Sequence, residues 1–333
     1  MVKKKIGSTG MEASSIILVT WSMGGDEQWG EKSDDQASVD VILKAYDNGI
    51  NLIDTAPAYG FGHSEEVVGK ALKQLPRDKV LVETKHGIWW LDDEGTFMRE
   101  RDGYRTYFNV SRRCVMREVE ESLRRLGTDY IDIYMVHHQA RPPFNTPISE
   151  TMGALMDLKK QGKIRAIGVS NCNDEQLKEY IKCGELDVLQ ESFSMLNQSN
   201  VKAHLEICKE HNISFEAYAP LEKGLLSGNL RMDYVIPDDK NVRNNVPWYA
   251  PERRQKVLDM LDGWKPLCEK YGCTQAALSI AWTSNYDENI FVLSGGRKWK
   301  HMESYIAGGS VKLDPVDFQK MSVDINALLA QYE

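Results

Sequence analysis

Long apolar runs, excess basic charge and clustered cysteines are all missing from this 333-residue sequence. No apolar stretch approaches the roughly 20 residues of a membrane-spanning helix, and the lysines near the start are not followed by the apolar segment of a signal peptide. The net charge of −8 argues against nucleic-acid binding through a basic face. The six cysteines show no CxxC spacing, as is typical of free thiols in a reducing compartment. We therefore expect a cytoplasmic protein without nucleic-acid or membrane partners.

Glycine-rich phosphate loops and metal motifs are missing too. The segment 22–26, after the first predicted strand, lacks the GxGxxG fingerprint. The segment 60–62 has two glycines, but the third would fall at position 65, where Glu65 stands. There is no Walker loop, no HExxH and no Cys/His cluster, so we predict no metal site. These absences disfavour an open doubly wound sheet, which is the main alternative fold.

Short apolar runs alternate with amphipathic helical patterns along the whole chain. One helix is expected to begin at a capping box of Ser33 and Gln36 and to end at Gly49. Further helical stretches are expected near 252–271 and 274–285. We predict one domain over residues 1–333, an α/β fold of the (β/α)8 TIM-barrel type with additional C-terminal helices. The eight predicted strands lie near residues 16–21, 51–55, 80–85, 131–137, 164–170, 187–191, 214–218 and 289–294.

Polar residues gather at the C-terminal ends of these strands, where barrel enzymes hold their chemistry. Asp54 and Lys85 end neighbouring strands, so they can pair, and the pair alone could be purely structural. His137 and His138 are adjacent on a predicted strand, so we expect their side chains on opposite faces. That arrangement would exclude a two-histidine metal site at the mouth of the barrel.

Three segments give the sequence a family resemblance. The stretch Asn51-Leu-Ile-Asp-Thr-Ala-Pro-Ala-Tyr-Gly60, with Glu83-Thr-Lys85 and Tyr134-Met-Val-His137, resembles the aldo-keto reductases, in their bacterial general stress and sugar reductase-like subgroup. The resemblance covers nearly the whole chain, because several further motifs follow in the same order. These motifs are Gly162–Asn171, Asp187–Gln190, Tyr218–Leu221, Gly224–Leu226 and Gly295–Arg297.

The resemblance implies a nicotinamide-dependent carbonyl reductase with the catalytic tetrad Asp54, Tyr59, Lys85 and His137. It implies that Trp21, Tyr59, Trp89 and His137 contact the substrate. The chain departs from the family pattern at His301, Ser304 and Tyr305, which weakens the inferred adenine contacts. The cofactor residues that the resemblance implies are Thr20, Trp21, Asp54, Ser170, Asn171, Gln190, Tyr218, Pro220, Leu221, Gly224, Leu226, Ser227, Gly295, Arg297 and His301.

Tyr59 would then be the proton donor to the carbonyl oxygen. The ordinary pKa of tyrosine is about 10, and an ammonium about 4 Å away would favour the phenolate by roughly 4 kcal/mol, on the order of three pH units before desolvation opposes it. Asp54 would keep Lys85 charged, and His137 would orient the carbonyl oxygen. We therefore expect Lys85 to lower the pKa of Tyr59.

The basic residues Arg297, Lys298 and Lys300 suit a 2′-phosphate, so we predict NADPH over NADH. The long loop 87–110 is rich in aromatic and arginine side chains, which would suit a sugar or polar glycoside but could equally pack a lid.

Other functions stay open. One is a sugar dehydrogenase that works in the oxidative direction. Another is a cofactor-binding regulatory subunit like those attached to potassium channels, which the early first strand disfavours. A third, a non-catalytic barrel, is disfavoured by the complete tetrad.

Overall fold

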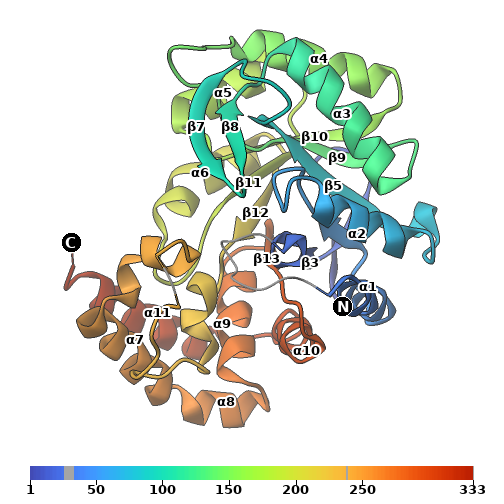
Figure 1. The fold of residues 1–333 in the computed structure, drawn as a ribbon. Coiled ribbons are helices and arrows are strands. Elements are labelled where there is room, and N and C mark those ends of the chain that lie inside the picture. Colours follow the sequence, from blue (N-terminus) through green and yellow to red (C-terminus); the bar gives the residue numbers. More distant parts are fainter. Residues whose placement is uncertain (26–33, 238, 333) are drawn as a thin grey trace.

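The core is a closed barrel of eight parallel strands, as predicted, in the computed structural model that describes residues 1–25, 34–237 and 239–332 (Figure 1). The strands follow the order β10-β11-β12-β13-β3-β4-β5-β9 around the barrel. Because both faces of each strand are covered, the strand bodies are mostly apolar. Their bounds are β3 (Ile16–Val19), β4 (Leu52–Asp54), β5 (Leu81–His86), β9 (Ile131–Val136), β10 (Ile164–Ser170), β11 (Val188–Ser192), β12 (Ser214–Tyr218) and β13 (Ile290–Ser294).

Helices between the strands, and one that follows the last strand, cover the outside of the barrel. The predicted capping residue Ser33 lies outside the described residues, and the side chain of Asp34 caps the first helix by accepting from the backbone N–H of Ala37 at 3.0 Å. These helices are α1 (Asp35–Asp47), α2 (His63–Leu72), α3 (Arg112–Leu126), α4 (Ile148–Lys160), α5 (Asp174–Cys183), α6 (Ser199–Glu210), α9 (Gln275–Ser284) and α10 (Trp299–Gly308).

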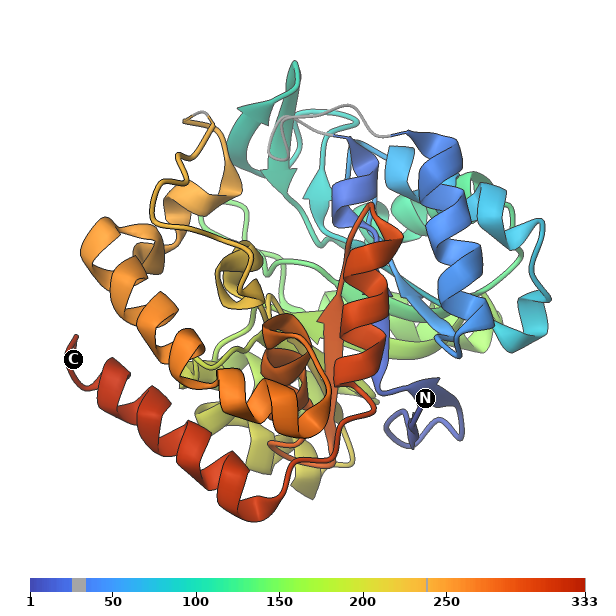
Figure 2. The same cartoon turned by 90° about the horizontal axis from the view of Figure 1, so that it is seen from below.

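Three further helices, α7 (Pro251–Gly263), α8 (Lys265–Tyr271) and α11 (Pro315–Leu329), gather on one side of the barrel, away from the N-terminus (Figure 2). The stretch 252–271 is two helices, because the chain turns at Trp264 and a proline opens α8. In the described part of the chain, no helix combines the length and apolar character needed to cross a membrane.

A small hairpin closes the N-terminal end of the barrel. Its strands are β1 (Lys3–Lys5) and β2 (Glu12–Ser14). Ile6 and Met11, between them, pack with side chains of the barrel interior such as Leu52. The other end of the barrel is therefore the open one.

The segment predicted as a long loop after β5 is instead a three-stranded antiparallel sheet. It consists of β6 (Ile88–Trp89), β8 (Tyr104–Phe108) and β7 (Thr96–Arg101), in that spatial order. The β7–β8 turn is Asp102-Gly103, and both residues have positive φ, as a tight two-residue hairpin turn requires. The loop prediction was wrong because this turn signal was not recognised.

Candidate active site

A cleft of about 1960 Å³ lies at the C-terminal ends of the barrel strands. Its lining includes Tyr59 and His137 of the predicted tetrad, and also Arg297 and His301 of the predicted phosphate and adenine region. The cleft therefore joins the predicted catalytic and cofactor residues in one continuous space.

The predicted ion pair at the strand ends is present. Lys85 on β5 donates to the carboxylate of Asp54 on β4, and both side chains are fully buried. The Lys85 ammonium also donates to the carbonyl of Thr55 at 3.1 Å and lies 3.4 Å from the hydroxyl of Tyr59. Three of the four predicted tetrad residues are thus linked by direct contacts, with the tyrosine hydroxyl at the cleft side of the lysine.

The electrostatics of this group differ from the expectation in one respect. Burial lowers the pKa of Lys85, but Asp54, Tyr59 and Glu83 together raise it by more, so the net shift is upward and the lysine stays charged. Burial raises the pKa of Tyr59, and the opposing effect of Lys85 is smaller, so the net shift is upward. The predicted lowering by Lys85 is present, but the opposing effect of desolvation, which the sequence alone does not quantify, is larger.

His137 follows β9 and completes the group. Its ring meets the Tyr59 ring edge-on, with centroids 5.8 Å apart. Burial first, and then His138 and Lys85, hold the pKa of His137 well below its usual value, so the imidazole is neutral. A neutral imidazole at this place can donate a hydrogen bond to a carbonyl oxygen beside Tyr59.

The two histidines do not point to opposite faces, contrary to the expectation. Their rings stack at 5.3 Å with an interplanar angle of 9°, and both line the cleft. The reason is that β9 ends at Val136, so the alternation of a strand no longer applies at His137 and His138. Within the described residues, no group of three or more metal-binding side chains is present.

Close backbone packing fixes the Tyr59 loop. Gly60 has a φ of +64°, and a Cβ placed there would lie 2.2 Å from the carbonyl oxygen of Gly24. A Cβ on Gly24 would lie 2.6 Å from the carbonyl carbon of Tyr59. The Trp21 ring stacks on the Tyr59 ring at 5.9 Å. The two loops can approach this closely because neither glycine carries a side chain.

Four of the predicted cofactor residues, Ser170, Asn171, Gln190 and Tyr218, come together on the β10 to β12 side of the cleft, and the family resemblance implies that they contact the nicotinamide. Asn171 has a φ of +55°, accepts from the Tyr218 hydroxyl at 2.8 Å, and donates to the carbonyl of His137 at 2.9 Å. Ser170 and Gln190 also line the cleft. Asn171 therefore holds both the Tyr218 ring and the His137 backbone in place.

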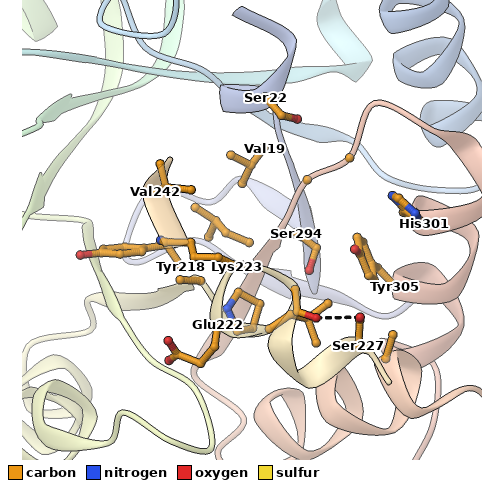
Figure 3. Close-up of a pocket in the computed structure, with 18 of the residues that line it drawn as sticks. Val19, Ser22, Tyr218, Glu222, Lys223, Ser227, Val242, Ser294, His301 and Tyr305 are labelled. Atoms are coloured by element: carbon orange, nitrogen blue, oxygen red, sulfur yellow. Dashed lines mark hydrogen bonds between the residues drawn. The ribbon is translucent and has the colours of Figure 1, made fainter. Parts of the chain in front are cut away.

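The predicted phosphate and adenine residues lie farther along the cleft. Figure 3 shows His301 and Tyr305 of α10 across the cleft from Tyr218 and Lys223. Ser294 lies between them in this view, and its buried hydroxyl has no hydrogen-bond partner within the described chain. A buried donor of this kind, facing a cleft, fits a dinucleotide that would supply the partner. Pro220, Leu221, Gly224, Ser227, Gly295 and Arg297 also line the cleft.

Three predicted contact residues lie behind the cleft wall. Thr20 is fully buried and donates to the carbonyl of Asp54, and Leu226 is fully buried in the core. Trp89 was predicted to contact substrate, but it is also fully buried, and its indole N–H donates to Asp92 at 2.6 Å. The contacts predicted for these side chains stay predictions, and burial in the surrounding packing, which motif position alone does not reveal, keeps all three out of the cleft lining.

Two residues that line the cleft, Arg101 and Lys223, were not among the predicted cofactor and substrate residues. Arg101 on β7 lines the cleft with 6% of its surface exposed, and it donates to the carbonyl of Ala58 beside Tyr59. Lys223 lines the cleft over the Trp21 ring, at 5.4 Å. The sequence signal for Arg101 was its position just before the Asp102-Gly103 turn, which the loop interpretation obscured.

The hydroxyl of Tyr59, a potential proton donor, lies beside the buried Asp54–Lys85 ion pair at the open end of a (β/α)8 barrel. This arrangement points to an enzyme that reduces carbonyl groups. Comparison with known proteins agrees, since the model of the Aldo/keto reductase family matches residues 15–323. The chain belongs to this family and is an oxidoreductase.

Three relatives cover nearly the whole chain. An NADH-specific methylglyoxal reductase from Escherichia coli is 42% identical, over 98% of this chain and 99% of the relative. An aldo-keto reductase from Bacillus subtilis is 36% identical, over 97% and 92%. The solved structure of a glycerol dehydrogenase from Gluconobacter oxydans gives a TM-score of 0.85 at 33% identity, over 98% and 95%.

Proposed function

We propose that this protein reduces small aldehydes and ketones to alcohols with a reduced nicotinamide cofactor, and that Tyr59 donates the proton. The observation that carries the proposal is the contact of 3.4 Å between the Tyr59 hydroxyl and the Lys85 ammonium, at the wall of the cleft that contains Gln190 and Ser294.

In the proposed reaction, His137, Tyr59 and Lys85 have separate roles. When bound, the reduced nicotinamide supplies a hydride to the carbonyl carbon. His137, held neutral, donates a hydrogen bond that orients the carbonyl oxygen. Tyr59 gives its proton to the alkoxide, which is a stronger base than a phenolate, and Lys85 stabilises the phenolate that remains.

The raised pKa of Tyr59 affects which direction of the reaction, reduction or oxidation, the site can support at a given pH. A protonated tyrosine serves reduction, whereas oxidation of an alcohol needs the phenolate as base. At neutral pH the tyrosine is thus in the form that reduction needs. The oxidative alternative, which the glycerol dehydrogenase from Gluconobacter oxydans exemplifies by name, would be favoured at alkaline pH.

We infer that the substrates are short polar carbonyl compounds, such as 2-oxoaldehydes and aldoses. The substrate end of the cleft combines Trp21 and His138 with the guanidinium of Arg101, whose charge acts on His137. Such donors suit a substrate with a second oxygen near the reacting carbonyl. The name of the Escherichia coli relative, a methylglyoxal reductase, supports the 2-oxoaldehyde part of this inference.

A cofactor-oxidation screen tests the activity and the substrate class together. The panel pairs each polar substrate with an apolar aldehyde of similar size. We expect kcat/KM for 2-oxoaldehydes and aldoses to exceed that for the matched apolar aldehydes by roughly tenfold or more, because hydrogen bonds to charged groups are worth about 1.5–3 kcal/mol. A preference for the apolar members would contradict the substrate inference, and no turnover of any member would contradict the activity.

We also propose that NADPH is preferred over NADH. Arg297, Lys298 and Lys300 all line the cleft, next to His301. We expect Arg297→Ala to weaken NADPH binding by roughly 10- to 100-fold and to leave NADH binding nearly unchanged, because only NADPH carries the 2′-phosphate. Isothermal titration calorimetry measures the affinity of the variant for each cofactor, and Arg124→Ala on α3 is the control.

The name of the Escherichia coli relative points to NADH instead. Equal affinity of the wild-type protein for both cofactors, or tighter binding of NADH, would therefore refute the NADPH assignment while leaving the proposed activity intact. A cytoplasmic location and the absence of nucleic-acid partners stay predictions.

A further inference from the structure

Three carboxyl groups and one ammonium meet inside the barrel around the side chain of Gln190. Asp54, Glu83, Glu216 and Lys85 come from β4, β5 and β12, and each is at most 1% exposed. The side-chain nitrogen of Gln190 lies 2.6 Å from a Glu83 oxygen, 3.0 Å from a Glu216 oxygen and 3.1 Å from an Asp54 oxygen. The proposed mechanism uses Asp54 and Lys85, and it assigns nothing to the two glutamates.

The charges in this group do not balance if every acid is ionised. Lys85 pairs with Asp54, and neither Glu83 nor Glu216 forms an ion pair within residues 1–25, 34–237 and 239–332. Two uncompensated carboxylates at full burial would be very costly. At least one glutamate therefore keeps a proton when the surrounding solution is neutral.

Counting hydrogens gives the same result. The Gln190 amide has two N–H groups but three carboxyl oxygens within hydrogen-bond distance. A further hydrogen must come from a protonated acid for these contacts to be favourable. Glu83 is the better candidate, because its carboxyl group is within hydrogen-bonding reach of both Asp54 and Glu216 and can donate to either of them.

The same group determines which way the Gln190 amide faces. If the amide were turned over, its oxygen would meet carboxyl oxygens, which is unfavourable. With its nitrogen directed toward the acids, the amide oxygen remains available on the cleft side, where Gln190 is part of the lining. An acceptor at this place suits the NH2 group of a nicotinamide carboxamide.

We propose that Glu83 and Glu216 are positioning residues, which share one proton and hold the Gln190 amide with its oxygen toward the nicotinamide. This inference rests on the proposed function. Glu83 holds the proton, and Glu216 is the group whose ionisation adds a negative charge as the pH rises. Glu216 contacts Gln190, whose side chain lines the cleft. Its negative charge would therefore favour the oxidised cofactor, whose nicotinamide ring is positively charged, over the neutral ring of the reduced form.

The surroundings of Glu216 support this assignment. Burial raises the pKa of Glu216 to about 7, and the hydrogen bond from Gln190 opposes that rise. The pKa of Glu83 is raised well above its usual value by burial and by Glu216. The groups that face Glu216 are Asp54 from β4, Glu83 and Lys85 from β5 and the amide of Gln190 from β11, and its neighbour in register on β13 is the uncharged Phe291.

Cofactor binding as a function of pH tests the proposal without turnover. The dissociation constants of NADP⁺ and NADPH are measured by calorimetry on both sides of neutrality, with NAD⁺ and NADH as a second pair. For the wild-type protein we expect the affinity for the oxidised form, relative to the reduced form, to rise by roughly tenfold as Glu216 ionises. In Glu216→Gln, which keeps the shape but cannot ionise, this ratio is expected to be independent of pH.

Two further variants separate positioning from folding. Glu83→Gln keeps a hydrogen donor, so it should retain the pH dependence, with a midpoint at or below that of the wild type. Glu118→Gln, which removes another buried glutamate that lies outside the barrel against Gly87, should behave as the wild type does. Unfolding curves of all three variants show whether each one is folded.

The outcomes are distinct. A Glu216→Gln protein that keeps the pH-dependent ratio overturns the proposal, as does a wild-type ratio without pH dependence. Loss of the dependence in Glu83→Gln overturns the assignment of the proton to Glu83, even if Glu216→Gln does not fold. If the wild-type protein binds none of the four cofactors, the proposed function itself is contradicted. The other outcomes leave the proposed function intact.

Discussion

Replacing Tyr59 by phenylalanine is expected to lower kcat for carbonyl reduction by roughly two to four orders of magnitude, the usual contribution of a general acid. The ring and its stacking on Trp21 remain, and only the hydroxyl that contacts Lys85 is lost. Cofactor affinity should therefore stay nearly constant, so that the loss lies in kcat. Stopped-flow measurement of the first turnover, with the cofactor already bound, detects the effect directly.

The control for this variant is Tyr46→Phe, which removes a hydroxyl from α1, outside the cleft lining. It should leave kcat unchanged. A folded Tyr59→Phe protein with wild-type kcat would show that another group supplies the proton, and His137 would then be the next candidate, because its ring adjoins that of Tyr59.

Replacing Lys85 by methionine is expected to have the largest effect on stability. The change leaves the Asp54 carboxylate fully buried without its ammonium, and breaking a buried pair in this way costs about 3–5 kcal/mol. Chemical denaturation followed by circular dichroism measures the loss of unfolding free energy. Activity should also fall sharply, because the phenolate of Tyr59 loses its stabilising charge.

The double variant Asp54→Asn with Lys85→Met distinguishes a buried-charge penalty from lost packing. With neither charge present, the unfolding free energy should recover a large part of the loss, although activity should not return. If the double variant were as unstable as the sum of the two single variants, the ion pair would not be the source of the effect.

The barrel could be predicted from the sequence because its strands are buried on both faces and therefore read as short apolar runs between helical patterns. The sheet of β6, β7 and β8 was missed for the opposite reason. Its strands are partly exposed and carry charged and aromatic side chains such as Arg99 and Phe97, which resemble a loop in composition. Only the Asp102-Gly103 turn marked it.

Some features of the site could likewise be predicted from the sequence, and others could not. Asp54 and Lys85 could be paired from the sequence because parallel strands bring their ends to one edge. The stacking of His137 on His138 could not, because it depends on where β9 ends. Nor could the raised pKa of Tyr59, because burial is a property of the assembled barrel rather than of the local sequence.

The sheet inserted after β5 supplies part of the substrate end of the cleft but none of the predicted catalytic tetrad. It contributes Met98, Arg99 and Arg101 to the cleft, whereas the tetrad comes from β4, β5, the Tyr59 loop and the end of β9. Sequence change at Met98 and Arg99 can thus alter which carbonyl compounds are accepted while the proton donor and its ion pair stay the same, whereas Arg101 also contacts the Tyr59 loop. A lineage built on this barrel could acquire new substrates in small steps, each of which leaves a working catalyst.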